Sequence, residues 1–195
     1  MKIDLCHPFK DVLPDIEEFF KADNGVGVIN TINALCNRIK KLAEKYAEII
    51  REEDFKGWAL ELFAEYLIKT NASDNRIGIY NYVPVTGGEE DDLGVDGHGV
   101  GENQNPSTVQ VKFRAGDYVL RANEDHLSNF LVSSWNDFGV RMEDDKNMLI
   151  ITTGQKVDDW TREKMLKGKV RVLNREALGK CWIIVLSGGF SSMKQ

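Results

Sequence analysis

The chain is poor in the residues that mark several common classes of protein. Its three cysteines, Cys6, Cys36 and Cys181, are far apart and include no CxxC pair. This spacing argues against a disulfide framework and against a cysteine zinc site. No apolar run approaches the length of a membrane span, and the N-terminus lacks the long apolar stretch of a signal peptide. We therefore expect an intracellular, cytoplasmic protein without a membrane partner.

The charge of the chain is negative overall but unevenly distributed. A net charge of −6 argues against DNA binding, because contacts to phosphate depend mainly on lysine and arginine. Residues 146–180, however, contain nine Lys and Arg against four Asp and Glu. This local excess would also suit an ordinary solvated surface, but it favours a DNA-binding face in this part of the chain. The candidate contacts are Lys156, Arg162, Lys164, Lys167, Lys169 and Arg171.

The N-terminal part carries a heptad pattern. Its apolar positions are Val28, Ile32, Leu35, Ile39, Leu42, Tyr46 and Ile49. The alternating spacing of four and three predicts a long helix with an apolar seam. We expect residues 1–54 to form a helical extension that joins two copies in a homodimer. Packing of the seam on a preceding helix around residues 14–21 is the alternative that the pattern leaves open.

The rest of the chain alternates between helix and strand patterns. Helices are expected at 55–70, 122–138 and 158–166, with a helical turn at 175–179. Strands are expected at 77–83, around Asp96, and at 107–113, 147–152, 170–173 and 181–186. This order predicts an α/β sandwich around a mixed sheet, in one domain spanning residues 55–186. The small and polar residues 187–195 are expected to form a flexible tail.

Polar residues within this pattern indicate a reactive site. Gln110 and Lys112 are two apart in a strand and therefore share a face, which Asp96 can reach from the neighbouring strand. Glu61 and Glu65 lie beside the apolar stripe of the helix at 55–70. The glycine-rich residues from Gly97 to Gly101 are expected to form a flexible connection that could approach DNA, with His98 as a weaker candidate contact.

These residues resemble the core motif of the PD-(D/E)xK nuclease superfamily, in particular its Mrr-like, restriction-endonuclease-like branch. That core consists of a helix with a glutamate, then DxGxD, then QxK. Here the three elements are Glu61, the segment from Asp92 to Asp96, and Gln110-Val111-Lys112. The resemblance covers residues 55–186 and implies a restriction-endonuclease-like fold and a Mg²⁺-dependent DNA endonuclease of the restriction or homing type.

The resemblance also assigns roles to these residues. Asp96, the side-chain oxygen of Gln110 and the Val111 carbonyl would bind Mg²⁺, or Mn²⁺ in its place, and Glu61 would hold a water of the metal from the helix side. Lys112 would orient the attacking water or stabilise the charged transition state. Many relatives have an acid where this chain has Gln110, so weaker metal binding is expected. A nuclease-fold module that binds DNA or a partner without cutting, and a DNA-junction resolvase, are the alternatives.

Overall fold

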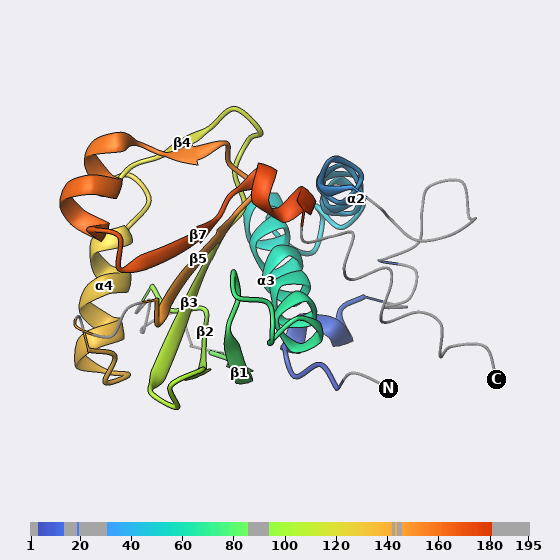
Figure 1. Cartoon of the computed structure of the whole chain (residues 1–195). Coiled ribbons are helices and arrows are strands. Elements are labelled where there is room, and N and C mark those ends of the chain that lie inside the picture. Colours follow the sequence, from blue (N-terminus) through green and yellow to red (C-terminus); the bar gives the residue numbers. More distant parts are fainter. Residues whose placement is uncertain are drawn as a thin grey trace.

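The structure is a computed structural model that describes residues 4–13, 19, 31–85, 94–141, 143 and 146–180. Its elements, in chain order, are η1 (Pro8–Asp11), α2 (Ile32–Lys45), α3 (Glu52–Thr70), β1 (Ile79–Pro84), β2 (Gly97–Gly101), β3 (Pro106–Lys112), β4 (Val119–Leu120), α4 (Leu127–Asn136), β5 (Met148–Thr152), β6 (Lys156–Val157), η2 (Thr161–Leu166) and β7 (Val170–Leu173) (Figure 1). The helix expected around 14–21, apart from Phe19, lies outside the described residues, as do the strand at 181–186 and the tail at 187–195. None of the described helices is long and apolar enough to cross a membrane.

Five of the strands form one mixed sheet, in the order β1-β2-β3-β5-β7. The neighbours β1, β2 and β3 are antiparallel, whereas β3, β5 and β7 run parallel. Parallel neighbours need a crossover connection, and α4 lies in the connection from β3 to β5. The short strands β4 and β6 form a separate parallel ladder. The predicted α/β class with a mixed sheet between helices is confirmed.

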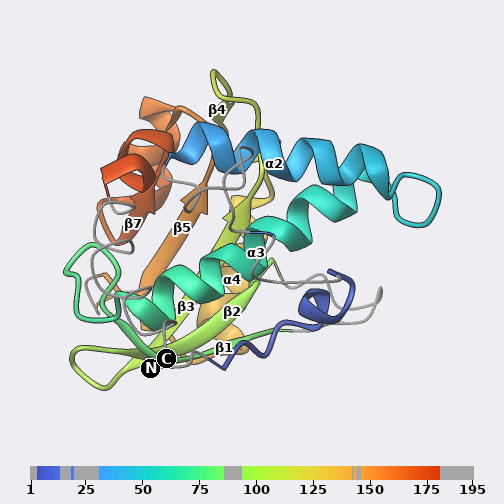
Figure 2. The same ribbon diagram turned by 90° about the vertical axis from the view of Figure 1, so that its right-hand side faces the viewer.

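Helices cover both faces of this sheet. In Figure 2, α2 and α3 lie in front of the sheet and α4 lies behind it. Side chains alternate between the two faces along a strand, so neighbouring residues of β5 serve different cores. Leu149 and Ile151 pack with α2 and α3, whereas Met148 and Ile150 pack with α4 and η2. We call these surfaces the α3 face and the α4 face of the sheet.

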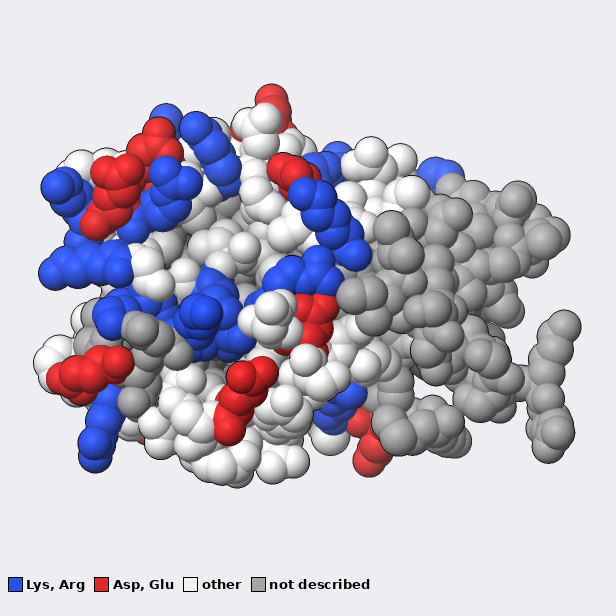
Figure 3. Space-filling view, in the orientation of Figure 1, with Lys and Arg blue, Asp and Glu red and all other residues white. Residues whose placement is uncertain are grey.

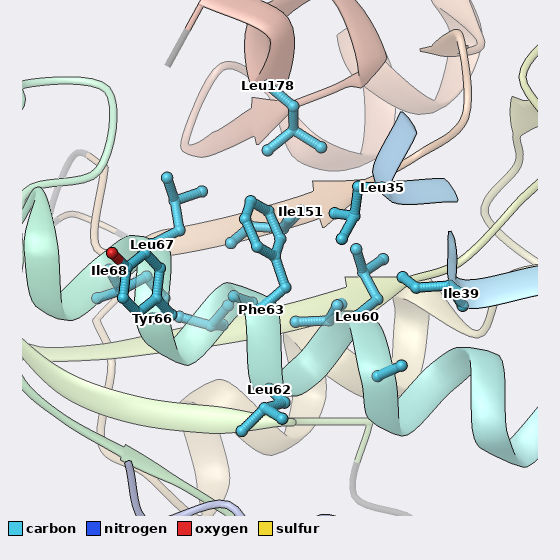
Figure 4. Close-up of a cluster of buried hydrophobic side chains, with 14 of the residues drawn as sticks. Leu35, Ile39, Leu60, Leu62, Phe63, Tyr66, Leu67, Ile68, Ile151 and Leu178 are labelled. Carbon is cyan, nitrogen blue, oxygen red and sulfur yellow. The ribbon is translucent and has the colours of Figure 1, made fainter. Parts of the chain in front are cut away.

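The apolar seam of α2 packs against other parts of the same chain. Leu35 and Ile39 are fully buried in the core that α3 shares with the sheet. Figure 4 shows these two side chains facing Leu60 of α3. The helix is shorter than the heptad pattern predicts, and Ile49 beyond its end is 80% exposed. The described part of the seam is therefore buried within the chain, against α3, and the homodimer stays a prediction.

The expectation of a flexible connection from Gly97 to Gly101 is wrong, because these residues form β2 in the middle of the antiparallel part of the sheet. Three glycines in five residues hide the alternation by which strands are recognised. The glycines are required by close packing. A Cβ on Gly97 would lie 2.1 Å from the phenolic oxygen of Tyr82, and one on Gly99 would lie 2.5 Å from the carbonyl oxygen of Tyr80.

Two other elements differ in detail from the expected ones. The helix α4 begins at Leu127 rather than at Ala122, after a left-handed residue at His126 with a φ of 54°. The helix expected at 158–166 is present, but from Thr161 to Leu166 it is π-helical. The helix α3 agrees closely with its prediction. Acidic residues in its first turn and Lys69 in its last turn complement the helix dipole.

Candidate functional site

Asp96 lies one residue before β2. It makes hydrogen bonds to the residues of β3 that precede and follow Gln110. Its N–H donates to the carbonyl of Val109 at 2.9 Å, and its carboxylate oxygen Oδ2 accepts the N–H of Val111 at 2.5 Å. The Asp96 side chain thus adds one hydrogen bond to the ladder between β2 and β3, just before the first residue of β2. As a result, the Asp96 carboxylate lies beside the middle of the Gln110-Val111-Lys112 segment.

Gln110 is fully buried near the end of β3. Its partner in β5 is Ile150, so its side chain lies on the α4 face, as does that of Thr108, whose hydroxyl contacts the Ser134 hydroxyl at 2.8 Å. Within the described part of the chain, neither Oε1 nor Nε2 of Gln110 has a hydrogen-bond partner. Leaving a buried polar group unpaired costs about 1–3 kcal/mol, so such a group needs a specific explanation.

Lys112 lies two residues further along on the same face and is half-buried. Its backbone is clamped to the end of β5, because its carbonyl accepts the Thr152 hydroxyl at 3.0 Å and the Thr153 N–H at 3.2 Å. The Lys112 side chain therefore starts from a rigid point at the carboxyl ends of the parallel strands β3 and β5. Open α/β sheets commonly bind their ligands at this end.

Glu61 belongs to α3, which covers the face of the sheet opposite to the side chains of Gln110 and Lys112. Its Oε2 accepts a hydrogen bond from Nε2 of His7 at 2.9 Å, and its side chain is 18% exposed. The Nδ1 atom of His7 accepts the N–H of Phe9 at 3.2 Å. An imidazole nitrogen that accepts carries no proton, so the proton of His7 lies on Nε2. The sequence contained no signal for this pair, because the two residues are 54 positions apart.

Tyr82 connects the surroundings of Glu61 and Asp96. Its phenolic oxygen lies 3.5 Å from the Asp96 carbonyl oxygen. Burial raises the pKa of Tyr82 well above its usual value, and the nearby charges of Asp96, Glu61 and Glu65 raise it further. The charges of three carboxylates from different elements therefore act on the same buried phenol. The aromatic and β-branched pattern of β1 predicted a strand but not this position.

Glu65, one turn after Glu61, is occupied by structural contacts. It is fully buried and accepts the backbone N–H groups of Cys6 at 2.6 Å and His7 at 2.9 Å. Lys69 adds an ion pair at 2.7 Å. These bonds attach the N-terminal segment to α3 and leave Glu61 as the α3 carboxylate that is available to a site.

The residues around Asp96 include few candidate metal ligands. In the described ranges, no group of three or more His, Cys, Asp or Glu residues could hold a metal ion. Asp96 would supply one carboxylate, while Gln110 Oε1 and the Val111 carbonyl would supply neutral oxygens. This set fits Mg²⁺, which keeps several waters and needs only one or two carboxylates. The unpartnered Gln110 amide supports the fit, and the single carboxylate predicts weak binding.

The six basic residues predicted to contact DNA follow one another on β6, η2, β7 and the turns between them. Figure 3 shows Lys and Arg side chains over this part of the molecule, with acidic side chains among them. Lys156, Lys164 and Lys167 are exposed, as is Arg162, which pairs with Asp159 at 3.2 Å. Lys169 is half-buried.

Arg171 differs from the other five basic residues. It is half-buried, and burial lowers the pKa of its guanidinium group. Its Nη1 lies 2.8 Å from the position that a Cβ on Gly78 would take. The Arg171 side chain is therefore packed against the segment before β1 and does not extend into solvent with the four exposed residues.

Similarity to known proteins gives no indication of what this site does. Comparison of the chain with protein families, with curated proteins and with solved structures finds no match. The function of the site is therefore inferred from the geometry of Asp96, Gln110 and Lys112.

Proposed function

We propose that the protein is a Mg²⁺-dependent endonuclease that hydrolyses DNA phosphodiester bonds, with a restriction-endonuclease-like core of the PD-(D/E)xK type. The observation that carries this proposal is the amide of Gln110. It is fully buried and has no partner among the described residues, and Asp96 makes hydrogen bonds to the backbone of the residues before and after Gln110. A cation ligand accounts for a buried, unpaired amide oxygen in a strand to which a carboxylate is bonded at the next residue, whereas packing alone would favour an apolar residue.

Each residue then has a distinct task. Bound Mg²⁺ would neutralise charge on the phosphate and make water a better nucleophile at neutral pH. Asp96 would supply the negative charge that holds the cation, and Gln110 would add an oxygen without adding charge. Lys112 would direct its ammonium group at the phosphate, where a positive charge stabilises the transition state more than the ground state. Glu61 would orient water from the α3 side.

The proposal is tested by incubating the intact chain with supercoiled plasmid in Mg²⁺, in Mn²⁺ and in EDTA. Nicked or linear plasmid with either metal and intact plasmid in EDTA is the expected result. A four-way junction and a linear duplex of the same sequence are tested in parallel, because cleavage restricted to the junction would indicate a DNA-junction resolvase. Intact DNA in every metal-containing sample would contradict the nuclease.

A binding module that does not cut is the second candidate. Two observations favour it. The Asp96 carboxylate already serves a structural hydrogen bond to Val111, and the described residues include no group of three or more His, Cys, Asp or Glu residues that could hold a metal ion. Under this alternative the chain shifts a labelled duplex in a gel, the shift does not depend on metal, and no cleavage follows.

DNA binding through the basic face predicts a specific effect of charge reversal. Lys164, Lys167 and Lys169 changed together to Glu should weaken binding to all sequences and reduce the salt slope of log Kd by about 0.9 for each phosphate that is no longer neutralised. The matched control reverses Lys40, Lys41 and Lys45, which are exposed on α2 and change the net charge equally. Fluorescence anisotropy across a salt series measures both effects. Equal reductions in the two triple variants would place the DNA elsewhere.

Cleavage of both strands of a duplex favours two copies acting together, so we also propose a homodimer. Because the α2 seam is covered within the chain, the dimer has to form through another surface. Light scattering at tens of micromolar is expected to give twice the chain mass of 22.1 kDa. A mass that stays at one chain across that range would remove the homodimer from the proposal.

A further inference from the structure

The N-terminal segment from Asp4 to Asp11 is fastened to α3 close to Glu61. Glu65 accepts the backbone N–H groups of Cys6 and His7, and Lys69 donates to the carbonyl of Asp4 at 2.7 Å. These bonds come from both ends of one helical turn of α3. They fix the backbone of His7 relative to the helix that carries Glu61.

The imidazole of His7 is fixed as well. The His7 side chain is 7% exposed, its Nδ1 accepts the N–H of Phe9, and its Nε2 donates to Oε2 of Glu61. Rotation of the ring would break both bonds in a place that water hardly reaches. The ring therefore has one orientation, and its hydrogen bond fixes the position of Oε2 of Glu61. The other oxygen, Oε1, makes no hydrogen bond within the described residues.

We propose that His7 is a positioning residue, which holds the Glu61 carboxylate with Oε1 free to act at the Asp96 site. This inference rests on the proposed nuclease function and assigns a role in that function to the N-terminal segment. Tyr82 supports the link, because its buried phenolic oxygen lies 3.5 Å from the Asp96 carbonyl while its ring belongs to the core beneath α3. Hydrogen-bond partners that orient the groups around a metal commonly change metal affinity or activity about 10-fold or more.

The test compares the wild-type chain with three variants. His7→Ala removes the donor to Glu61, whereas His7→Gln keeps an N–H donor at about the same reach. Lys69→Met is the matched control, because it weakens the attachment of the same segment without removing either partner of the His7–Glu61 pair. Calorimetric titration with Mn²⁺ measures metal affinity without DNA, plasmid nicking across Mg²⁺ concentrations measures function, and circular dichroism checks that each variant is folded.

We expect His7→Ala to lower Mn²⁺ affinity and to raise the Mg²⁺ concentration for half-maximal nicking, each about 10-fold. His7→Gln should recover most of both, and Lys69→Met should resemble the wild type. If alanine prevents folding, His7→Phe keeps a ring in the core without the hydrogen bonds and takes its place.

Three results would overturn the positioning role. A wild type that binds Mn²⁺, together with an unchanged affinity in His7→Ala, would remove His7 from the site and leave the nuclease proposal standing. Equal effects in His7→Ala and Lys69→Met would assign the change to attachment of the segment. A wild type that neither binds Mn²⁺ nor cuts DNA would remove the proposed function, and the role of His7 with it.

Discussion

Asp96→Asn is expected to abolish metal-dependent DNA cleavage while the protein stays folded and still binds DNA. Asparagine keeps a side-chain oxygen that can accept the Val111 N–H, as Oδ2 of Asp96 does at 2.5 Å. It loses the negative charge that the site offers to a cation next to β3. The substitution therefore separates the structural hydrogen bond of Asp96 from its proposed role in binding metal.

Three further variants complete this experiment. Asp96→Ala loses both the charge and the hydrogen bond, which should cost about 1 kcal/mol of stability in addition to activity. Lys112→Ala should also abolish cleavage, because it removes the positive charge from the rigid end of β3. Gln110→Glu adds a charge where a metal ligand is proposed, so it should lower the Mg²⁺ concentration needed for half-maximal cleavage, or at least preserve activity.

The measurement is a metal titration of plasmid nicking, with urea unfolding of each protein as the check on stability. Full activity in Asp96→Asn would exclude the proposed site. A weaker response to Mg²⁺ in Gln110→Glu would show that Gln110 is not a ligand and that its buried amide has another purpose. Loss of folding in Asp96→Asn would mean that the acid is held in place for stability.

Glu65→Ala is expected to cost the most stability, about 3–5 kcal/mol, because it removes a buried charge and leaves its partners unpaired. The carboxylate is fully buried and serves Cys6, His7 and Lys69. The matched variant is Glu61→Ala, one turn away on the same helix. Glu61 accepts the hydrogen bond of His7 and is 18% exposed, so its removal should cost only about 1 kcal/mol.

The two alanine variants should therefore differ most in their stability. Glu65→Ala should lower the urea midpoint strongly. Glu61→Ala should unfold almost as the wild type does but need more Mg²⁺ for cleavage. Similar stability in both variants would mean that the bonds of Glu65 do not contribute to attachment of the N-terminal segment.

The sequence by itself determined the elements whose signals are local. The apolar stripe of α3 and the alternation in β3 and β5 follow from the periods of 3.6 and 2 residues, and their observed bounds lie close to the expected ones. The same alternation placed Gln110 and Lys112 on one face. Asp96 came to lie beside them because a strand that precedes β3 by a short hairpin pairs with it in antiparallel register.

Only the tertiary structure decided the features that depend on distant partners. The strand β2 is one such feature. The Tyr82 phenol and the Tyr80 carbonyl occupy the space that side chains at Gly97 and Gly99 would need, and this explains why the strand contains glycines. The ladder of β4 and β6 has two residues in each strand, too few for any period. An apolar seam is equally stable against any apolar surface, so the heptads of α2 could not reveal whether their partner was α3 or a second copy. The contact between His7 and Glu61 has no sequence signal because chain folding, rather than spacing, brings together residues 54 positions apart.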